Sequence, residues 1–511
     1  MLYFINYYFL SAVLLLIAGN AFGQSYFPPV PAAVYPYEFE NNGLIDERYF
    51  LLTPFRLATP PSSPDYKDTG PIIVDQNGVL VWYADGSTAI STIDFKYYAA
   101  QEQYSYSIVH NDTSMVVIMD NQFSITDTLR AINGEADIHD VQRATNGNWL
   151  LTMEYYDTVD LSAYTFGPVQ GSATTRLMGF GWQEIDPGGN LIYEWNSNDH
   201  IDPLQFYNSY GYSPNPFDYC HGNALEEDTD GNILLSFRHL NAIYKINRAS
   251  GGIIWRLGGQ SSDFTFPNDD GFSGQHDIRR LPNGHYSLFD NANMMQNPKI
   301  SRGVEYELDT VNWTATMVNE VVHPDVFFAR AMGNYQQTGD DESMICYGLV
   351  FRPEPTATLF GADELPLVQF FFDDSVVSYR CHIESDLTIS RPEITCEWNG
   401  NEWRLTAVNP AAEYLWSTGE TTASIVITQT GYYQLWVPGS TGHLGSALVN
   451  VTDINNPCSF VGLEELQAKT DQSFVLYDLL GHLVVSPKSD CLYIKQFADG
   501  TTEKWFFGSG K

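Results

Sequence analysis

Short apolar strands broken by polar turns recur along most of the chain. The segment Ile73–Trp82 runs from one apolar strand, through an Asp-Gln-Asn-Gly turn, into a second apolar strand that ends in Trp. Glu184–Trp195 and Lys245–Trp255 repeat the same order, each with an Asp- or Asn-containing turn that includes glycine. Strands joined by turns of this composition are typical of β-hairpins. The pattern therefore predicts consecutive hairpins between about residues 50 and 377.

A second repeating unit alternates with the first and begins with a histidine. His139 and His276 each lie eight residues before the turn glycine of their unit, and His221 lies ten residues before its own. Two hairpins make a four-stranded blade, and blades repeated around an axis make a β-propeller whose loops build a site at the mouth of the central channel. We therefore expect an all-β fold, with a propeller of about six blades over residues 24–377.

The pattern changes beyond Ser378. Short alternating strands between Trp398 and Val451, most clearly Tyr414–Thr421 and Gly431–Val437, predict a small β-sandwich over residues 378–456. This stretch resembles the immunoglobulin-like modules of secreted bacterial proteins.

The last segment, residues 457–511, carries a different resemblance. Val475–Val484 and Leu492–Lys504 are similar to the C-terminal sorting domain of type IX secretion cargo. The resemblance implies that the type IX secretion machinery is a partner. It also implies passage through the periplasm, removal of the tail, and release or attachment at the cell surface.

Residues 1–23 predict export by a signal peptide. Phe9–Ala18 is an apolar run, and Ala21–Gly23 supplies small residues for cleavage before Gln24. Because no Lys or Arg precedes the run, an uncleaved anchor is the alternative. The six cysteines of an exported chain suggest disulfides, with Cys381–Cys396 and Cys458–Cys491 as locally plausible pairs among about 15 connectivities.

The charge balance excludes some partners. The chain has 62 acidic and 25 basic residues and a formal net charge of −37. Binding to a phosphate backbone requires basic stripes, and the sequence has none. We therefore expect no nucleic-acid partner, and a membrane role only through secretion or surface attachment.

The candidate chemistry lies in the histidine units. Equivalent positions of a repeat lie at equivalent places around the axis, so His139, His221 and His276 are expected in one ring at the channel mouth. Arg238 ends the apolar strand Ile233–Phe237 of the second unit, where aligned turn glycines place Glu154 and Asn291 in the other units. A guanidinium beside imidazoles suits an oxyanion. The structural alternatives are hydrogen-bonded core histidines and an arginine paired with a surface acid.

Several stretches resemble, in order and spacing, the signature of aryl-sulfate sulfotransferases: Cys220–Ala224, Leu234–Ile243, Ile254–Gly259, Gln275–Ile278 and Leu288–Asn291. The resemblance covers most of residues 45–370. It implies a six-bladed propeller, a phenolic sulfate donor, a phenolic acceptor, and catalysis without a nucleotide sulfate donor, metal or other cofactor. Carried over by position, His276 matches the nucleophile, and His139, His221 and Arg238 match the residues that hold the sulfate group and handle protons.

The residues suit this chemistry. A neutral imidazole can attack sulfur as a phenolate leaves, which predicts a sulfohistidine intermediate and ping-pong kinetics. Glu154 is a second candidate for removing the acceptor's proton, after a histidine. Tyr155, Tyr156 and Phe272 are candidates for contact with the phenol rings.

Two other functions compete with this one. A secreted propeller that binds sulfated or carbohydrate ligands without turnover would have little reason to retain all four site residues. A metal- or quinone-dependent propeller enzyme is weaker, because the sequence shows no carboxylate arrangement beside the histidines. Asp228–Asn232 imitates the start of a calcium loop, but it lacks the distant Glu and falls at a hairpin tip, so we interpret it as a turn.

Overall fold

The protein is described by a computed structural model that covers residues 24–44, 46–57, 67, 70–84, 91–110, 113–294, 298–339, 341–373, 375–385 and 387–458, and beyond them the strands Phe460–Val461, Phe474–Tyr477, Leu483–Val484, Cys491–Phe497 and Thr502–Phe507. Strands dominate this part of the chain, and its helices are short 3-10 turns. The predicted all-β fold is confirmed. No helix among the described residues is long and apolar enough to cross a membrane. The predicted signal peptide, residues 1–23, lies outside the described residues.

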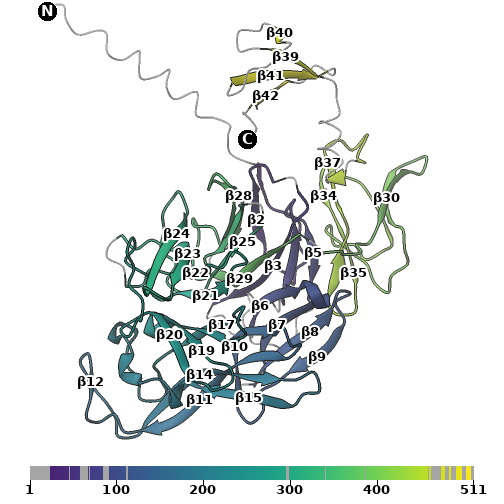
Figure 1. The fold of residues 1–511 in the computed structure, drawn as a ribbon. Coiled ribbons are helices and arrows are strands. Elements are labelled where there is room, and N and C mark those ends of the chain that lie inside the picture. The colour runs from purple at the N-terminus through teal and green to yellow at the C-terminus, as the bar shows by residue number, and fades with distance from the viewer. Residues whose placement is uncertain are drawn as a thin grey trace, which may run out of the picture.

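Four antiparallel sheets follow one another along the middle of the chain (Figure 1). In each sheet the first strand pairs with the strand that follows it in sequence, as a hairpin requires. The first sheet contains β6 (Ser91–Tyr98), β7 (Gln103–His110), β8 (Thr113–Asp120) and β9 (Ile125–Leu129). The second contains β10 (Glu135–Arg143), β11 (Trp149–Val159), β14 (Thr175–Ile185) and β15 (Leu191–Asn196), with β16 (Phe217–Asp218) beside β14.

The third and fourth sheets repeat this order. The third contains β17 (Gly222–Glu227), β18 (Ile233–Phe237), β19 (Ala242–Ile246) and β20 (Ile253–Gly258). The fourth contains β21 (His276–Arg280), β22 (Tyr286–Asp290), β23 (Arg302–Asp309) and β24 (Thr314–Val322). The Asp228–Asn232 segment is the turn between β17 and β18, and the carboxylates of Asp228 and Asp230 each lie 2.7 Å from the ammonium of Lys245. Both carboxylates thus form ion pairs with a lysine, which agrees with the interpretation of this segment as a structural turn.

Two further sheets join the beginning of the chain to residues far along it. One has the order β1-β2-β28-β27-β26-β25, and the other begins β29-β3-β4-β5. Their strands are β1 (Gln24–Tyr26), β2 (Tyr37–Asn41), β3 (Tyr49–Arg56), β4 (Ile72–Asp75), β5 (Leu80–Tyr83), β25 (Asn334–Gln337), β26 (Ser343–Cys346), β27 (Ala357–Phe360), β28 (Pro366–Phe372) and β29 (Val376–Glu384). The predicted domain boundary at 377/378 falls inside β29, which pairs with β3.

The first strands of successive sheets lie against each other. β6 contacts β10, β10 contacts β17, β17 contacts β21, and β29 contacts β6 and β25. Five of these strands, β6, β10, β17, β21 and β29, carry a register shift of the kind that a β-bulge makes, and a bulge re-aims the side chains beside it. The strands that carry the candidate site therefore gather around one centre.

The predicted sandwich region is attached to this body through backbone pairing. β36 (His443–Gly445) pairs with β5 and extends its sheet through β35 (Leu435–Pro438) to β32 (Leu415–Trp416). The indole of Trp82 donates to the carbonyl of Thr441, and the Gln434 amide donates to the carbonyl of Leu80. The edge strand β5 is thereby covered, which removes a row of unpaired backbone groups.

The remaining strands of this region form two small sheets. One contains β30 (Ile394–Trp398), β31 (Trp403–Ala407) and β33 (Ser424–Val426), and the other β34 (Gly431–Tyr433), β37 (Leu448–Val451) and β38 (Phe460–Val461). In the C-terminal segment β39 (Phe474–Tyr477) to β42 (Thr502–Phe507) form a four-stranded sheet, and the rest of residues 462–511 lies outside the described residues.

The cysteines pair differently from the local expectation. Cys396 forms a disulfide with Cys458, with Cα atoms 5.6 Å apart. The predicted Cys381–Cys396 pair is wrong, because Cys381 is a free, buried thiol inside β29 while Cys396 lies in β30. The predicted Cys458–Cys491 pair is wrong as well, because Cys458 is already bonded.

Candidate active site

Each predicted histidine stands where a first strand meets a loop or a bulge. His139 lies in β10 beside the register shift, His276 opens β21, and His221 immediately precedes β17. His221 has φ of 45°, and Asp277, which follows His276, has φ of 60°; both values lie in the left-handed region that is rare for such residues. The backbone at these positions thus departs from regular strand pairing, and this changes the direction of the side chains.

The structure brings the predicted residues together. The imidazole rings of His139 and His221 lie 5.3 Å apart between centroids. The ring of Tyr379, in β29, lies 5.6 Å from His139 and 6.5 Å from His276. We call His139, His221, His276 and Tyr379 the mouth layer. The Arg238 backbone amide donates to the His221 carbonyl at 2.9 Å, which joins the arginine to this layer.

His276 is held as a neutral, oriented base. Its side chain is buried, and its Nδ1 lies 2.7 Å from the Asn291 side-chain oxygen, so Nδ1 carries the proton. Nε2 is left with its lone pair, which accepts the Met332 backbone N–H at 3.1 Å. Burial first, and then the Arg238 guanidinium, hold the pKa of His276 well below its usual range. The imidazole is therefore uncharged at neutral pH.

His139 has the opposite electrostatic setting. Both oxygens of the Asp137 carboxylate lie within 2.9 Å of His139 Nδ1. Burial opposes the charge on this imidazole, but the carboxylate outweighs burial and raises the pKa of His139. His139 can therefore carry a proton near neutral pH while His276 does not, which separates the roles of acid and nucleophile within one layer.

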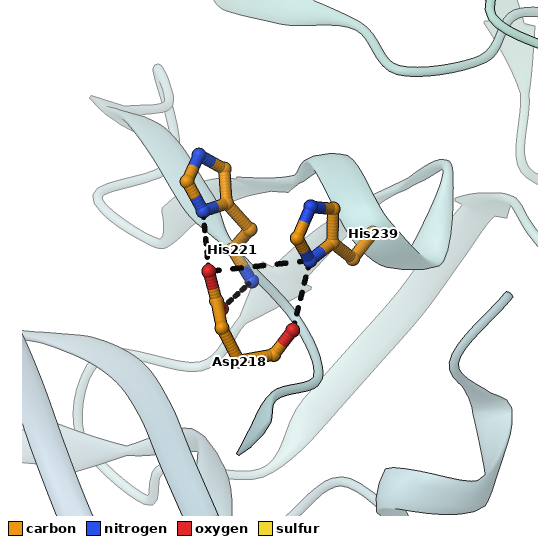
Figure 2. Close-up of side chains that lie close together, drawn as sticks. All are labelled: Asp218, His221 and His239. Carbon is orange, nitrogen blue, oxygen red and sulfur yellow. Dashed lines mark hydrogen bonds and ion pairs between the residues drawn. The ribbon is translucent and has the colours of Figure 1, made fainter. Parts of the chain in front are cut away.

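Asp218 joins His221 to a fourth imidazole, His239, which the sequence did not predict for the site (Figure 2). The Asp218 carboxylate lies 2.5 Å from His221 Nδ1, and the Asp218 backbone carbonyl accepts from His239 Nδ1 at 2.8 Å. Burial works against ionisation of Asp218, but the charge of His221 outweighs it and lowers the pKa of the carboxyl to about 2. Burial and the charge of His221 lower the pKa of His239 to about 3, so His239 is neutral.

These three residues are also the group of described side chains best placed to hold a metal ion. Their ligand atoms lie within 4.8 Å of one another. The expected absence of carboxylates beside the histidines is wrong, because Asp137 lies against His139 and Asp218 against His221. Both Nδ1 atoms, however, donate hydrogen bonds to Asp218, and a metal ligand must offer a lone pair instead. The donor set fits a hydrogen-bonded network better than a metal centre.

Arg238 presents a fixed cation to the site. It begins the 3-10 turn η5 (Arg238–Leu240), directly after β18. One guanidinium nitrogen donates to His239 Nε2 at 3.0 Å and another to the Arg330 carbonyl at 3.0 Å, while the guanidinium carbon lies 5.0 Å from the centre of the Tyr210 ring. None of these partners is a carboxylate, so its charge is available to an anionic ligand.

The candidates for phenol contact are scattered. Tyr156 donates to the Glu154 carboxylate and stacks under Arg176, whose guanidinium carbon lies 3.7 Å from the ring centre. Burial raises the pKa of Glu154. Phe272 lines a separate cavity of about 670 Å³ with Tyr207, Phe264 and Phe266. No contact of Phe272 joins it to the mouth layer within the described residues.

Four residues of the site were not singled out for it by the sequence analysis: Asp137, Asp218, His239 and Tyr379. Asn291 was expected as the counterpart of Arg238 in the aligned units and as the end of the Leu288–Asn291 stretch of the resemblance, without a role of its own. Asp137 stands two residues before His139 and Asp218 three before His221, so an acid shortly upstream of each histidine is the signal that could have found them. Tyr379 falls beyond the assumed end of the propeller, and for that reason it was not compared with the histidines.

One family model matches the middle of the chain. The model of the Arylsulfotransferase (ASST) family matches residues 103–350. This span contains His139, His221, Arg238 and His276 and ends before Tyr379. Among curated proteins, none matches the sequence.

Solved structures give weaker similarities. A protein of unknown function from Bacteroides caccae has 10% identity and a TM-score of 0.41, over 66% of this chain and 99% of that one. Virginiamycin B lyase from Staphylococcus aureus has 11% identity and a TM-score of 0.35, over 73% and 96%. The β-propeller domain of Cps50 (Swd1) from Myceliophteria thermophila has 10% identity and a TM-score of 0.31, over 76% and 94%.

Proposed function

We propose that this protein is an arylsulfotransferase that moves a sulfuryl group from a phenolic sulfate ester to a phenolic acceptor through a sulfohistidine at His276. The observation that carries the proposal is the neutral, oriented imidazole of His276 beside the guanidinium of Arg238 and beside His139, whose pKa the Asp137 carboxylate raises. The match of the arylsulfotransferase family model to the span that contains these residues supports it.

The first half-reaction transfers the sulfuryl group to the enzyme. The Nε2 lone pair of His276 must first leave the Met332 backbone N–H, whose hydrogen bond it accepts in the structure. It then forms a bond to sulfur as the sulfur–oxygen bond of the ester breaks, and the phenolic oxygen takes the bonding pair together with the proton of His139. Arg238 and His221 hold the equatorial oxygens, where charge gathers in a loose transition state. Losing one preorganised donor of this kind typically costs about 3 kcal/mol of barrier.

The second half-reaction reverses these roles. An acceptor phenol enters where the first phenol left, and the now neutral His139 removes its proton as the phenolic oxygen attacks sulfur. The nitrogen–sulfur bond breaks and returns the lone pair to His276. Since donor and acceptor use the same place in turn, the kinetics are ping-pong and no nucleotide sulfate donor takes part.

The rest of the chain fits a secreted enzyme. We propose that the six sheets around the common centre are six propeller blades, that residues 378–456 are an immunoglobulin-like module, and that residues 457–511 are a sorting domain for type IX secretion. A signal peptide at residues 1–23 would take the chain to the periplasm, from which it is released or attached to the cell surface.

Release of 4-nitrophenol from 4-nitrophenyl sulfate tests the proposal. Purified protein is assayed with and without added phenol, in the absence of nucleotide donor, beside His276→Ala and the control His285→Ala. We expect release that rises with phenol, vanishes in His276→Ala and persists in His285→Ala, because His285 pairs with Glu305 in the turn after β21. No release from any of a panel of aryl sulfates would refute transfer and favour a propeller that only binds sulfated or carbohydrate ligands.

A further inference from the structure

Tyr379 is the member of the mouth layer to which the proposed reaction gives no role. It precedes the buried Arg380 in β29, just as His139 precedes the buried Asp140. The register shift between Ser378 and Cys381 places Tyr379 at an irregularity like the one beside His139. Its position in the strand is therefore equivalent to that of a site histidine.

The Tyr379 hydroxyl has no internal partner. The side chain is 3% exposed, and the hydroxyl makes no hydrogen bond to any described residue. Buried hydroxyls are nearly always hydrogen-bonded, so a free one inside a candidate site calls for an external acceptor. Its ring stands edge-on to both His139 and His276, at interplanar angles of 63° and 72°.

The chemistry of the neighbours identifies that acceptor. The transferring sulfur must pass between the phenolic oxygen, which His139 protonates, and Nε2 of His276. The Tyr379 ring lies 5.6 Å from the His139 ring and 6.5 Å from the His276 ring between centroids. From this place beside both imidazoles we infer that its unpartnered hydroxyl reaches the group that moves between them. Burial raises the pKa of Tyr379 far above neutral, so the hydroxyl is always a donor.

We propose that Tyr379 is a further catalytic residue, whose hydroxyl donates a hydrogen bond to an equatorial oxygen of the transferring sulfuryl group; this rests on the proposed function. The O–H bond stays intact throughout, and no proton leaves the tyrosine. The hydrogen bond strengthens as charge gathers on the equatorial oxygens, so it stabilises the transition state more than the bound ester.

Tyr379→Phe removes the hydroxyl and keeps the ring, and the buried Tyr104 of β7 supplies the matched control, Tyr104→Phe. We expect kcat for 4-nitrophenyl sulfate to fall about 100-fold in Tyr379→Phe, with the melting temperature unchanged and Tyr104→Phe fully active. The loss should be equal for phenyl sulfate, a poorer leaving group. A loss that grows with the poorer leaving group would place the hydroxyl on the phenolic oxygen and overturn the assignment.

Calorimetric binding of inorganic sulfate separates this inference from the proposed function. Sulfate offers the same oxygens without requiring turnover, so Tyr379→Phe should bind it about tenfold more weakly than wild type. If wild type binds sulfate but transfers nothing, and Tyr379→Phe binds it more weakly, the Tyr379 contact stands and the proposed function fails. Equal sulfate affinity and equal kcat in wild type and Tyr379→Phe would overturn the contact.

Discussion

Two neighbouring layers around the common centre have opposite properties, although they come from consecutive residues of the same strands. The mouth layer contains two half-buried imidazoles, the buried imidazole of His276 and a tyrosine whose hydroxyl has no partner among the described residues. Directly after them come Asp140, Asp277 and Arg380, fully buried and paired. Together with Asp94, Lys96 and Arg279 these form what we call the ion layer. One residue along the strand thus separates the groups suited to chemistry from the groups that fasten the sheets together.

Arg380 is the central cation of the ion layer. Its guanidinium lies 2.6 Å from Asp94, 3.6 Å from Asp140 and 3.4 Å from Asp277. These carboxylates come from β6, β10 and β21, so a single arginine of β29 joins four sheets. Burial opposes its charge, but the three carboxylates outweigh burial and hold the pKa of Arg380 far above its usual range.

The largest expected effect is a loss of stability in Arg380→Leu. Removing one member of a buried ionic cluster leaves the others uncompensated, which typically costs about 3–5 kcal/mol. Chemical denaturation should show that loss, or no folded protein at all. The matched control is Arg352→Leu, because Arg352 pairs with Glu38 at a half-exposed site and should lose about 1 kcal/mol or less. Equal losses in the two variants would show that the ion layer stabilises the fold no more than a partly exposed ion pair does.

The next effect is on catalysis and comes from Asn291→Ala. The Asn291 oxygen fixes the proton of His276 on Nδ1, so its removal frees the ring to turn and to change tautomer. We expect kcat for 4-nitrophenyl sulfate to fall about 100-fold with little change in KM, because Asn291 lies behind the imidazole and does not touch the ester. A rise in KM at constant kcat would show instead that Asn291 serves substrate binding.

The sequence predicted the mouth layer better than the ion layer. The spacing of His139, His221 and His276 before their turn glycines is a local signal. From it we could predict that these histidines and Arg238 lie in one place in the fold. The ion layer depends on distances between strands that are far apart in sequence, such as the 286 residues between Asp94 and Arg380. Local periodicity carries no information about such pairs.

The end of the proposed propeller is the other feature that hairpin periodicity could not predict. The hairpin pattern weakens at Ser378, yet β29 continues to Glu384 because it pairs with β3 near the beginning of the chain. That closure is a long-range property, and so Tyr379 and Arg380 were placed outside the propeller. The same limit applies to Cys396, whose partner Cys458 is 62 residues away.

A smaller effect is expected on the pH dependence of transfer in Asp137→Asn. The Asp137 carboxylate raises the pKa of His139 against burial, so the acid form is present at neutral pH and is lost as pH rises through that pKa. Without the carboxylate, burial alone acts on His139 and lowers its pKa, so the alkaline limb of kcat should move to lower pH and the loss of kcat should grow as pH rises. A uniform loss at every pH would assign Asp137 to orienting the ring rather than to holding its proton.

The smallest effect is on stability in acid. It tests whether the buried, neutral His276 lowers the free energy of unfolding as pH falls. The pKa of His276 is depressed in the folded state, so between that pKa and the unfolded value of about 6.5 the unfolded chain binds more protons. The stabilisation is therefore complete above about pH 6.5 and is lost as pH falls. His276→Asn should lose less stability than wild type between pH 7 and pH 5.5, by about 1 kcal/mol, in denaturant titrations at each pH. Parallel losses in the two proteins would mean that His276 gains its proton without opposing the fold, and the electrostatic contrast between His276 and His139 would then fail.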